Sequence, residues 1–312
     1  MKAIAEKWRK SCAFYKGITY IKLIENKINY LNREKYDVTC GTREIMTEPN
    51  GLPDRFREIR ISNWVIGLSF GYLLASFLVP ALLPTDTIPE LSGRANAIDY
   101  MSKDSSWGDW GNEPHPEDGS MGHDQSEHGG KFAWSELDLF SAFVYAFGDI
   151  NCHQKHERSW EINGNQMPIC TRDVGIFAGI GVGGLIFRKR GLNRWTVRDT
   201  IISVLPDEKV EQFYFTDRRF LLAFGGIALL LLPTALDGGI QAITDYESTN
   251  LKRLLTGFPM GLGIGFLFSG VFAANPKPFD FNAEKVKLPA NARLVPYEDS
   301  DVIEESNIDE QE

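Results

Sequence analysis

The chain has 312 residues and a formal net charge of −9 at pH 7, and its length alone would suit two soluble domains. Its apolar residues are concentrated in long uncharged blocks, however, which favours a polytopic membrane protein over a soluble one. The charges are also segregated, because residues 1–62 are rich in Lys and Arg whereas residues 85–130 and 297–312 are acidic. A basic segment before a first membrane span is more typical of a topology signal than of a nucleic-acid surface, so we expect no nucleic-acid partner.

Residues 1–62 are predicted to be a small basic cytosolic region. The apolar residues between Ile18 and Leu31 recur near helical spacing among lysines. This pattern fits either an amphipathic helix on the membrane surface or a small packed subdomain. Cys12 and Cys40 fall in the same region, where free thiols are expected.

Three long runs contain no charged residue: Trp64 to Leu83, Phe220 to Leu236 and Leu254 to Pro276. Each is compatible with a buried core helix. Their lengths suit a ~30 Å hydrocarbon core, and they contain Gly and Pro, which membrane helices tolerate better than soluble ones. We therefore expect membrane helices here, beginning with a first span at 63–84. That span follows a charged segment, so it is not expected to be a cleaved signal peptide.

Two segments outside the apolar runs are predicted to lack a packed structure. Residues 85–131 form a flexible acidic loop, because their central part has almost no aliphatic side chains to offset the entropy of ordering. His115, His123 and His128 lie beside carboxylates in this loop, but their irregular spacing favours a solvated linker over a metal site. Residues 276–312 are predicted to form an acidic disordered tail.

Residues 132–275 are predicted to form the membrane core, which includes two shorter apolar segments. Residues 132–150 have a short uncharged centre, which suits a re-entrant or tilted helix. Val174 to Phe187 is Gly-rich, which is typical of a helix packed closely through small residues. The predicted fold is therefore an all-α membrane protein with about four transmembrane helices, one short re-entrant or tilted helix and a small N-terminal cytosolic region.

The basic flanks predict the orientation of a multi-pass protein in the cell membrane. The cluster "RKRGLNRWTVR" follows the Gly-rich helix, and positive charge favours the cytoplasmic side. If residues 132–150 do not cross the bilayer, both termini are cytoplasmic. Residues 152–173 and 237–253 then share the external side, and each of these segments carries a polar cluster.

The first cluster lies in the stretch "GDINCHQKHERSWEINGNQMPICTRDVGI". Cys152, His153, Cys170 and Asp173 are ligand types that suit zinc or another divalent metal, although their spacing matches no standard zinc finger. A Cys152–Cys170 disulfide, either structural or redox-active, is an alternative on an external loop. Two thiols that simply pack are a third possibility.

The second cluster, in "LDGGIQAITDYESTNLKRLLTG", begins with an acid after a long apolar run. Asp237 and Gln241 are four residues apart and share one helix face. Ionisable groups at membrane depth are costly and usually face a partner or a cavity, although Asp237 also fits a helix end in the headgroup zone. We assign predicted catalytic roles to Asp237, Gln241 and Arg253. We also predict that three side chains bind an anionic substrate, because guanidinium and amide groups donate hydrogen bonds to anions: Arg158, Arg172 and Asn250.

The two clusters also carry ordered motifs. The first contains "CHQ" followed by "ERS", and then Gly164, Pro168, Cys170, Arg172, Gly175 and Ile176 in the pattern G-x-x-x-P-x-C-x-R-x-x-G-I. The second contains "PTALDGGIQ" and "STNLKRLLTG". Over about residues 140–273 this pattern resembles a family of prokaryotic membrane proteins, domain of unknown function 2085. The resemblance implies a polytopic membrane protein, and the family offers no activity to transfer.

The chain departs from the family pattern at one position. Members often have a second cysteine in "C-x-R-C-x-G", where this chain has Asp173. An aspartate cannot form a disulfide but can still ligate a metal.

The sequence also lacks the common hydrolase, metalloprotease, phosphate-loop and dinucleotide motifs. Three functions remain open. The first is an enzyme that acts on a lipid or polyprenyl-linked substrate at an external polar site. The second is a non-enzymatic transporter, or a subunit that binds other membrane subunits, with structural polar clusters. The third is a thiol redox protein.

Overall fold

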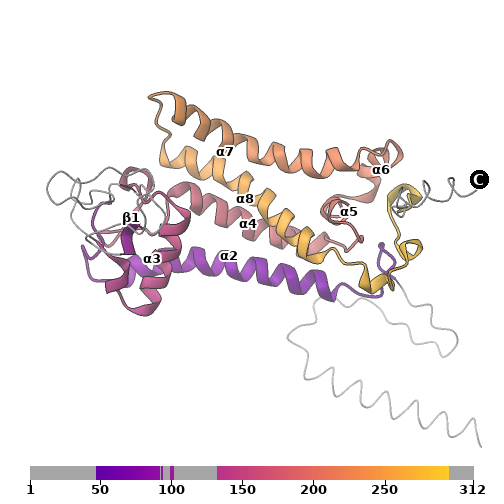
Figure 1. Cartoon of the computed structure of the whole chain (residues 1–312), viewed down its shortest axis with the longest axis horizontal. Helices are drawn as coiled ribbons and strands as arrows, with labels where there is room; N and C mark the ends of the chain where they lie inside the picture. The colour runs from indigo at the N-terminus through magenta and orange to yellow at the C-terminus, as the bar shows by residue number, and fades with distance from the viewer. Residues whose placement is uncertain (1–46, 92, 94–98, 102–131, 295–312) are drawn as a thin grey trace, which may run out of the picture. The chain divides into compact units, whose positions relative to one another are not determined.

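The computed structural model describes residues 47–91, 93, 99–101 and 132–294, and this part of the chain is mainly helical (Figure 1). The four longest helices of the described residues are α2 (Phe56–Leu82), α4 (Thr171–Arg190), α7 (Gly226–Ile243) and α8 (Asn250–Ala273). A π-helical turn, η5 (Leu221–Gly225), leads directly into α7. The predictions made for Cys12, Cys40 and the three loop histidines fall outside the described residues.

Shorter elements connect the long helices. They are the helices α3 (Leu139–Asn151), α5 (Val197–Ile202) and α6 (Asp207–Phe215), and a hairpin of β1 (Glu161–Ile162) and β2 (Asn165–Gln166). The remaining elements are 3-10 turns: η1 (Asp99–Met101), η3 (Trp134–Glu136), η4 (His156–Arg158), η6 (Lys277–Phe279), η7 (Ala283–Lys285) and η8 (Pro289–Asn291).

Three helical segments are long and apolar enough to cross a membrane: α2, η5 with α7, and α8. They confirm the predicted class, an all-α membrane protein. The short helix α3 spans about 20 Å at 1.5 Å per residue, which is less than a hydrocarbon core. Helix α4 is long enough to span but carries charges at both ends, so a fourth span at α4 stays a prediction.

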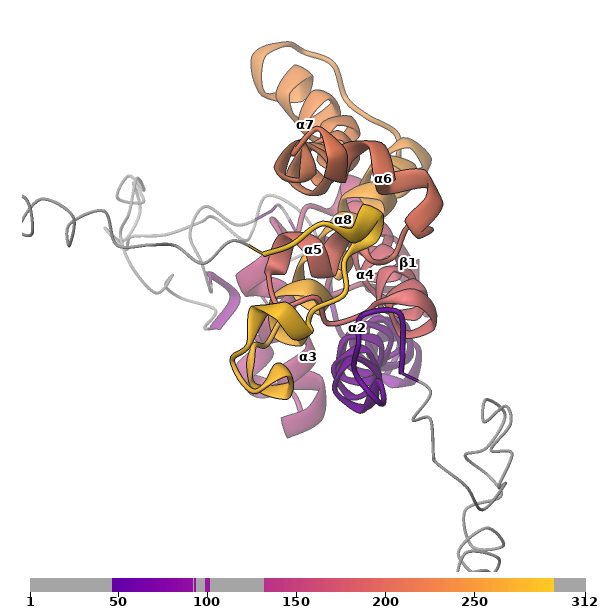
Figure 2. The same cartoon turned by 90° about the vertical axis from the view of Figure 1, so that its right-hand side faces the viewer.

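The four long helices run alongside one another (Figures 1 and 2). Helix α4 packs against α2 on one side and α8 on the other, and α7 packs on α8. One end of the bundle carries α3 and the β1–β2 hairpin, and we call it the hairpin end. The opposite end carries α5, α6 and the charged terminus of α4 at Arg188–Arg190, and we call it the basic end.

Helices α4 and α8 approach each other through two facing rows of glycine. Gly175, Gly179 and Gly183 recur every four residues on α4, and Gly257, Gly261 and Gly265 do the same on α8. A Cβ atom added at Gly261 would lie 2.0 Å from the carbonyl oxygen of Ile176, and one at Gly179 would lie 2.2 Å from that of Phe258. The two backbones are therefore in direct contact, as small residues permit in membrane helices.

Helix α2 uses serines for the same purpose. Ser62, Ser69 and Ser76 are buried at seven-residue intervals. Each hydroxyl donates a hydrogen bond to the carbonyl four residues earlier, at 2.7 to 2.9 Å. The polar atoms are thus satisfied within α2, and the small side chains leave room for neighbouring helices.

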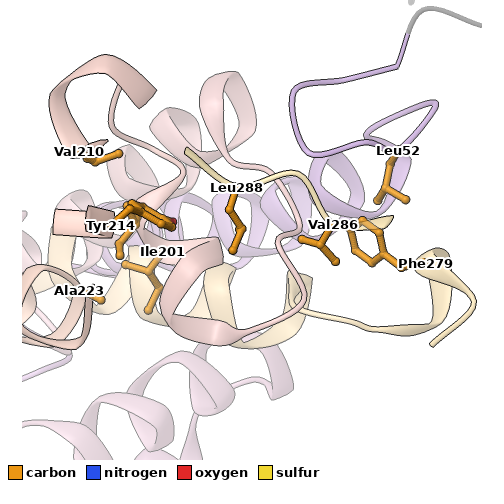
Figure 3. Packing of buried hydrophobic residues seen from close by; sticks show 9 residues of the cluster. Leu52, Ile201, Val210, Tyr214, Ala223, Phe279, Val286 and Leu288 are labelled. Carbon is orange, nitrogen blue, oxygen red and sulfur yellow. The ribbon is translucent and has the colours of Figure 1, made fainter. Parts of the chain in front are cut away.

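At the basic end, segments far apart in sequence close over the helix ends. Leu52, three side chains of the residues after α8 and the start of the η5–α7 segment form one buried cluster with α5 and α6 (Figure 3). Phe279, Val286 and Leu288 each contribute about 1.5–3 kcal/mol through this burial. The predicted disordered tail from residue 276 is therefore wrong for residues 276–294, which pack as part of the fold.

The start of α2 also belongs to the bundle. Arg55 donates hydrogen bonds to the carbonyl of Gly191, at 2.7 Å, and to other carbonyls at the end of α4. Arg57 donates to the carbonyls of Phe272 and Ala273 at the end of α8. Cationic side chains satisfy unpaired carbonyls at helix C-termini and oppose the negative end of the helix dipole. Residues 47–62, which were predicted as part of the cytosolic region, thus hold the ends of α4 and α8 together.

At the hairpin end, buried amides hold the connecting segments. Asn165 accepts a hydrogen bond from the Ile88 amide at 2.8 Å, and Gln166 accepts one from the Leu91 amide at 2.7 Å. Ile88 and Leu91 are each 1% exposed. The first residues of the predicted flexible loop, 85–91, are therefore an ordered part of the fold.

Because the α4–α8 contact leaves no room for a side chain, we expect Gly261→Ala to reduce the free energy of unfolding by about 1–3 kcal/mol. Gly71→Ala in α2 is the matched control, since nothing lies within 4 Å of its added Cβ. That control should be neutral or slightly stabilising through helix propensity. Unfolding of the purified protein in mixed micelles measures both values, and equal effects would contradict the close contact.

Candidate functional site

The site is built where the chain leaves α3 and enters α4. Cys152 follows the last residue of α3, and Cys170 is the residue just before α4. Gly148 lets the two segments meet, because a Cβ there would lie 1.9 Å from the carbonyl oxygen of Pro168. Gln154, which is 1% exposed, donates a hydrogen bond to the same oxygen at 2.8 Å. These contacts fix the separation of the two cysteines.

The two cysteines and an aspartate form a compact group. The backbone amide of Cys170 donates a hydrogen bond to the Cys152 sulfur at 3.1 Å, and the Cys170 thiol donates to an Asp173 oxygen at 3.4 Å. Both sulfurs and one Asp173 oxygen lie within 4.8 Å of one another. Asp173 is three residues after the helix cap, where side chains reach back to the cap residue.

Both cysteines are free thiols in the structure, and Cys152 is 3% exposed. The hydrogen bond with Cys170, burial and the nearby Asp173 carboxylate raise the pKa of the Cys152 thiol well above its ordinary value. Cys152 is therefore protonated at neutral pH when only protein groups surround it, and it is a poor nucleophile in that state.

An ion pair joins this region to the second polar cluster. Arg172, in the first turn of α4, pairs with Asp237 near the end of α7. The two side chains are 20% and 8% exposed, respectively. The Gln241 amide lies 3.5 Å from the same carboxylate oxygen. The pair thus links α4 to α7, which otherwise packs on α8.

A second set of ion pairs connects the loop after α3 with α8. Glu247 accepts hydrogen bonds from Arg158 at 2.9 Å and from Arg253 at 2.6 Å. Desolvation acts to raise the pKa of Glu247, but the two guanidinium groups outweigh it and hold the pKa below its ordinary value. Glu247 is consequently ionised at neutral pH. Asn250 accepts from Arg253 at 3.3 Å and from the Thr171 hydroxyl at 3.2 Å, which ties α8 to α4.

These groups surround a small pocket of about 100 Å³. Its lining includes both cysteines and four cationic side chains: Asn151, Cys152, His153, Lys155, Arg158, Cys170, Arg172, Asp173 and Arg253. The buried Nε atoms of Arg172 and Arg253 have no hydrogen-bond partner among the described residues. A larger hollow of about 470 Å³ beside Phe56 and Trp64 is open surface along α2, away from both clusters.

The structure brings most of the predicted site residues together. Seven of the ten predicted site residues line the pocket, and Asn250 accepts a hydrogen bond from the lining residue Arg253. Asp237 and Gln241 do not line it, and they contact it only through Arg172. His153 lines the pocket, but its nitrogens are not part of the compact group of ligand atoms.

Three residues of this region were not among the predicted site residues. Asn151 and Lys155 line the pocket, and Glu247 bridges two of its arginines. Nothing in the sequence around Lys155 distinguishes it from other surface lysines. Glu247 lies within the second polar cluster, and that position was the available signal.

The three apolar helices and the paired polar clusters at one end define an all-α integral membrane protein. The chain belongs to the family described as Predicted membrane protein (DUF2085), which matches residues 152–267. This range contains all of the pocket residues except Asn151, together with helices α4, α7 and most of α8. The predicted resemblance over about 140–273 is thus confirmed.

Two archaeal relatives support the assignment. An uncharacterized protein of Methanocaldococcus jannaschii is 30% identical over 134 residues, which cover 43% of this chain and 71% of that protein. An uncharacterized protein of Methanothermobacter thermautotrophicus is 30% identical over 116 residues, which cover 37% of this chain and 82% of that protein. No solved structure matches the chain.

The Arg172–Asp237 pair should stabilise the bundle. We expect Asp237→Asn to lower the free energy of unfolding by about 2–3 kcal/mol, because it leaves a largely buried guanidinium without its counter-charge. With Arg172→Gln in a double-mutant cycle, the coupling should reach about 1 kcal/mol or more.

The matched control for that cycle is Asp245→Asn. Asp245 is exposed, lies in the same connection and has no ion pair among the described residues. It should change stability by less than about 0.5 kcal/mol. Additive effects of the two pair mutations would show that the Arg172–Asp237 contact contributes nothing.

Proposed function

We propose that this protein binds the anionic headgroup of a lipid or polyprenyl-linked substrate in the pocket at the hairpin end. The observation that supports this proposal is the pocket wall, which contains Lys155, Arg158, Arg172 and Arg253. Two of these guanidinium groups have buried donors without partners among the described residues. Arginine presents planar donors that match phosphate and carboxylate oxygens.

Anchored arginines make a better anion site than mobile ones. Asp237 holds Arg172, and Glu247 holds Arg158 and Arg253, so each guanidinium is oriented before a ligand arrives. Prior orientation lowers the entropy lost on binding. Lys155 has no ion pair among the described residues and contributes an uncompensated positive charge.

The size and position of the pocket favour a membrane-linked ligand. About 100 Å³ accommodates a phosphate-sized group but excludes the hydrocarbon part of a lipid. Exposed apolar side chains lie close to pocket residues in the chain: Ile150 is next to Asn151, and Leu251 is two residues before Arg253. Such side chains suit contact with acyl or polyprenyl chains while the headgroup enters the pocket.

The proposed orientation follows the positive-inside rule. The basic end carries Arg188, Lys189 and Arg190 in the last turn of α4, so we place that end in the cytoplasm. The pocket then faces the external side of the cell membrane. With α4 as a fourth span, α2, α4, α7 and α8 cross in alternating directions and both termini are cytoplasmic.

The proposal assigns binding and leaves the reaction open. Asp237 contacts the pocket through Arg172, so it acts on the ligand by positioning that arginine; direct proton transfer by Asp237 and Gln241 stays a prediction. A second candidate is a non-enzymatic transporter or complex subunit. The ion pairs that connect α4 to α7 and α8 favour it, because they would stabilise the bundle without any ligand.

The test compares lipid binding of the full chain in phosphatidylcholine nanodiscs with and without dioleoyl phosphatidic acid or undecaprenyl phosphate. Native mass spectrometry should show preferential retention of the phosphomonoester lipids. Lys155→Gln should weaken retention about tenfold, as expected for one lost charge-assisted hydrogen bond of about 1.5 kcal/mol. This variant removes no ion pair of the described residues, so the fold should be unaffected.

Two controls separate pocket binding from general attraction. Arg190→Gln removes one exposed charge at the opposite end of α4 and should leave retention unchanged. Competition by inorganic phosphate at the lipid's own concentration would show that the headgroup alone is recognised, whereas weak competition would show that the chains contribute. Equal retention of phosphatidylcholine and phosphatidic acid by the wild-type protein would overturn the proposal.

A further inference from the structure

Two groups of three metal-ligating side chains lie within 4.8 Å of one another in the described part of the chain. One comprises Glu90, His156 and Glu161, whose carboxylates are about half exposed and pair with the imidazole at 3.6 Å. Exposed groups of this kind are well solvated and give no reason for a metal. The other group comprises Cys152, Cys170 and Asp173, and it borders the pocket.

We propose that Cys152, Cys170 and Asp173 bind one zinc-type divalent cation through two sulfurs and one carboxylate oxygen. This inference deepens the proposed function because the same pocket is involved, but it rests on different residues. Cysteine sulfur and carboxylate oxygen are established zinc ligands, and two sulfurs favour zinc over the hard cations magnesium and calcium.

The distances are compatible with this ion. Tetrahedral zinc with Zn–S bonds of about 2.3 Å needs its two sulfurs ~3.8 Å apart. The present ligand atoms lie within 4.8 Å, so an adjustment of about 1 Å, which side-chain rotation supplies, closes the site. The ligand positions are fixed by Gly148, Gln154 and the first turn of α4, and not by a flexible loop.

Groups around the site can contact the ligands and balance their charge once a metal displaces the thiol protons. The backbone amide of Cys170 donates a hydrogen bond to the Cys152 sulfur. Metal-bound thiolates typically accept such a hydrogen bond in addition to the bond with the metal. Two thiolates and a carboxylate around a divalent cation leave one net negative charge. The neighbouring cations compensate that charge. Lys155 has no ion pair with any described residue, and the three arginines are only partly balanced by two acids.

The pocket would then supply the fourth ligand. Three protein ligands with one open position are characteristic of zinc sites that bind a water or a substrate atom. His153 lines the pocket but stands outside the compact group, so the fourth position faces the same space as the arginines. An anionic group held by Arg172 and Arg253 would approach the metal directly.

The test measures zinc in the purified full chain by inductively coupled plasma mass spectrometry after dialysis against a mild chelator. We expect about one zinc per chain, as for a single site. Replacement by cobalt should produce thiolate-to-cobalt charge-transfer bands in the absorption spectrum. Cys170→Ser should lose the bound zinc and the bands, whereas the double variant Cys12→Ser/Cys40→Ser should keep both.

Because Cys152 is buried and its replacement can impair folding, Asp173 provides a second test. Asp173→Cys keeps three ligands with a softer one, so it should retain zinc and strengthen the cobalt charge-transfer bands. Asp173→Asn should weaken cobalt binding at least tenfold. No zinc in the wild-type protein together with a mobility shift under non-reducing conditions would overturn the metal site and favour the thiol redox alternative.

The two proposals fail separately. Lys155→Gln should weaken binding of phosphatidic acid while zinc stays bound. Cys170→Ser should lose zinc while the arginine wall remains intact. Retention of zinc in Cys170→Ser would overturn the metal proposal without affecting the anion proposal.

Discussion

The structure depends on the direct backbone contact between α4 and α8. Facing glycines allow it, because any side chain at Gly179 or Gly261 would collide with a carbonyl of the partner helix. The contact fixes how far one helix is shifted along the other. A Cβ at Gly257 would lie 2.3 Å from the carbonyl oxygen of Arg172, so the first turn of α4 lies beside the second turn of α8. Arg172 and Arg253 reach one pocket for this reason.

Hydrophobic burial does little to hold such helices together inside a membrane, since lipid chains are as apolar as leucine side chains. Helix α7 is an example, because only 11% of the residues in the most apolar stretch of Leu221–Ile243 are buried. Its position is secured by polar contacts, namely the Asp237–Arg172 pair and the Thr234 hydroxyl, which donates to the Thr256 carbonyl at 2.6 Å. The polar groups that form the candidate site therefore also determine where α7 lies.

Much of this arrangement could be predicted from the sequence. Long uncharged runs indicate membrane helices regardless of the tertiary contacts that the helices make. Polar residues that follow such runs indicate the end of the helix bundle where a site forms. Residues 276–294 could not be predicted, because Phe279 lies far from Val286 and Leu288 and the apolar residues form no sustained helical or strand pattern. Their burial depends on α5, α6 and Leu52, and thus on tertiary contacts. Lys155 was missed for a similar reason, since it lines the pocket only because of the path that the chain takes between α3 and α4.

The two ends of the bundle use arginine in different ways. At the basic end, Arg55 and Arg57 donate to backbone carbonyls at helix C-termini. Arg194, which is fully buried there, donates to both oxygens of Asp207, at 2.6 and 2.8 Å. At the hairpin end the arginines pair with carboxylates on one side and leave buried Nε donors on the other.

Burying a hydrogen-bond donor is offset only when the donor finds an acceptor, and a buried donor without an acceptor costs about 1–3 kcal/mol. Both ends retain such donors, because Nε and Nη1 of the fully buried Arg194 at the basic end also have no partner among the described residues. At the hairpin end, however, the arginines with unpartnered donors, Arg172 and Arg253, line a pocket of about 100 Å³. Their position at a pocket, more than the presence of charge alone, is the physical reason to place ligand binding at the hairpin end.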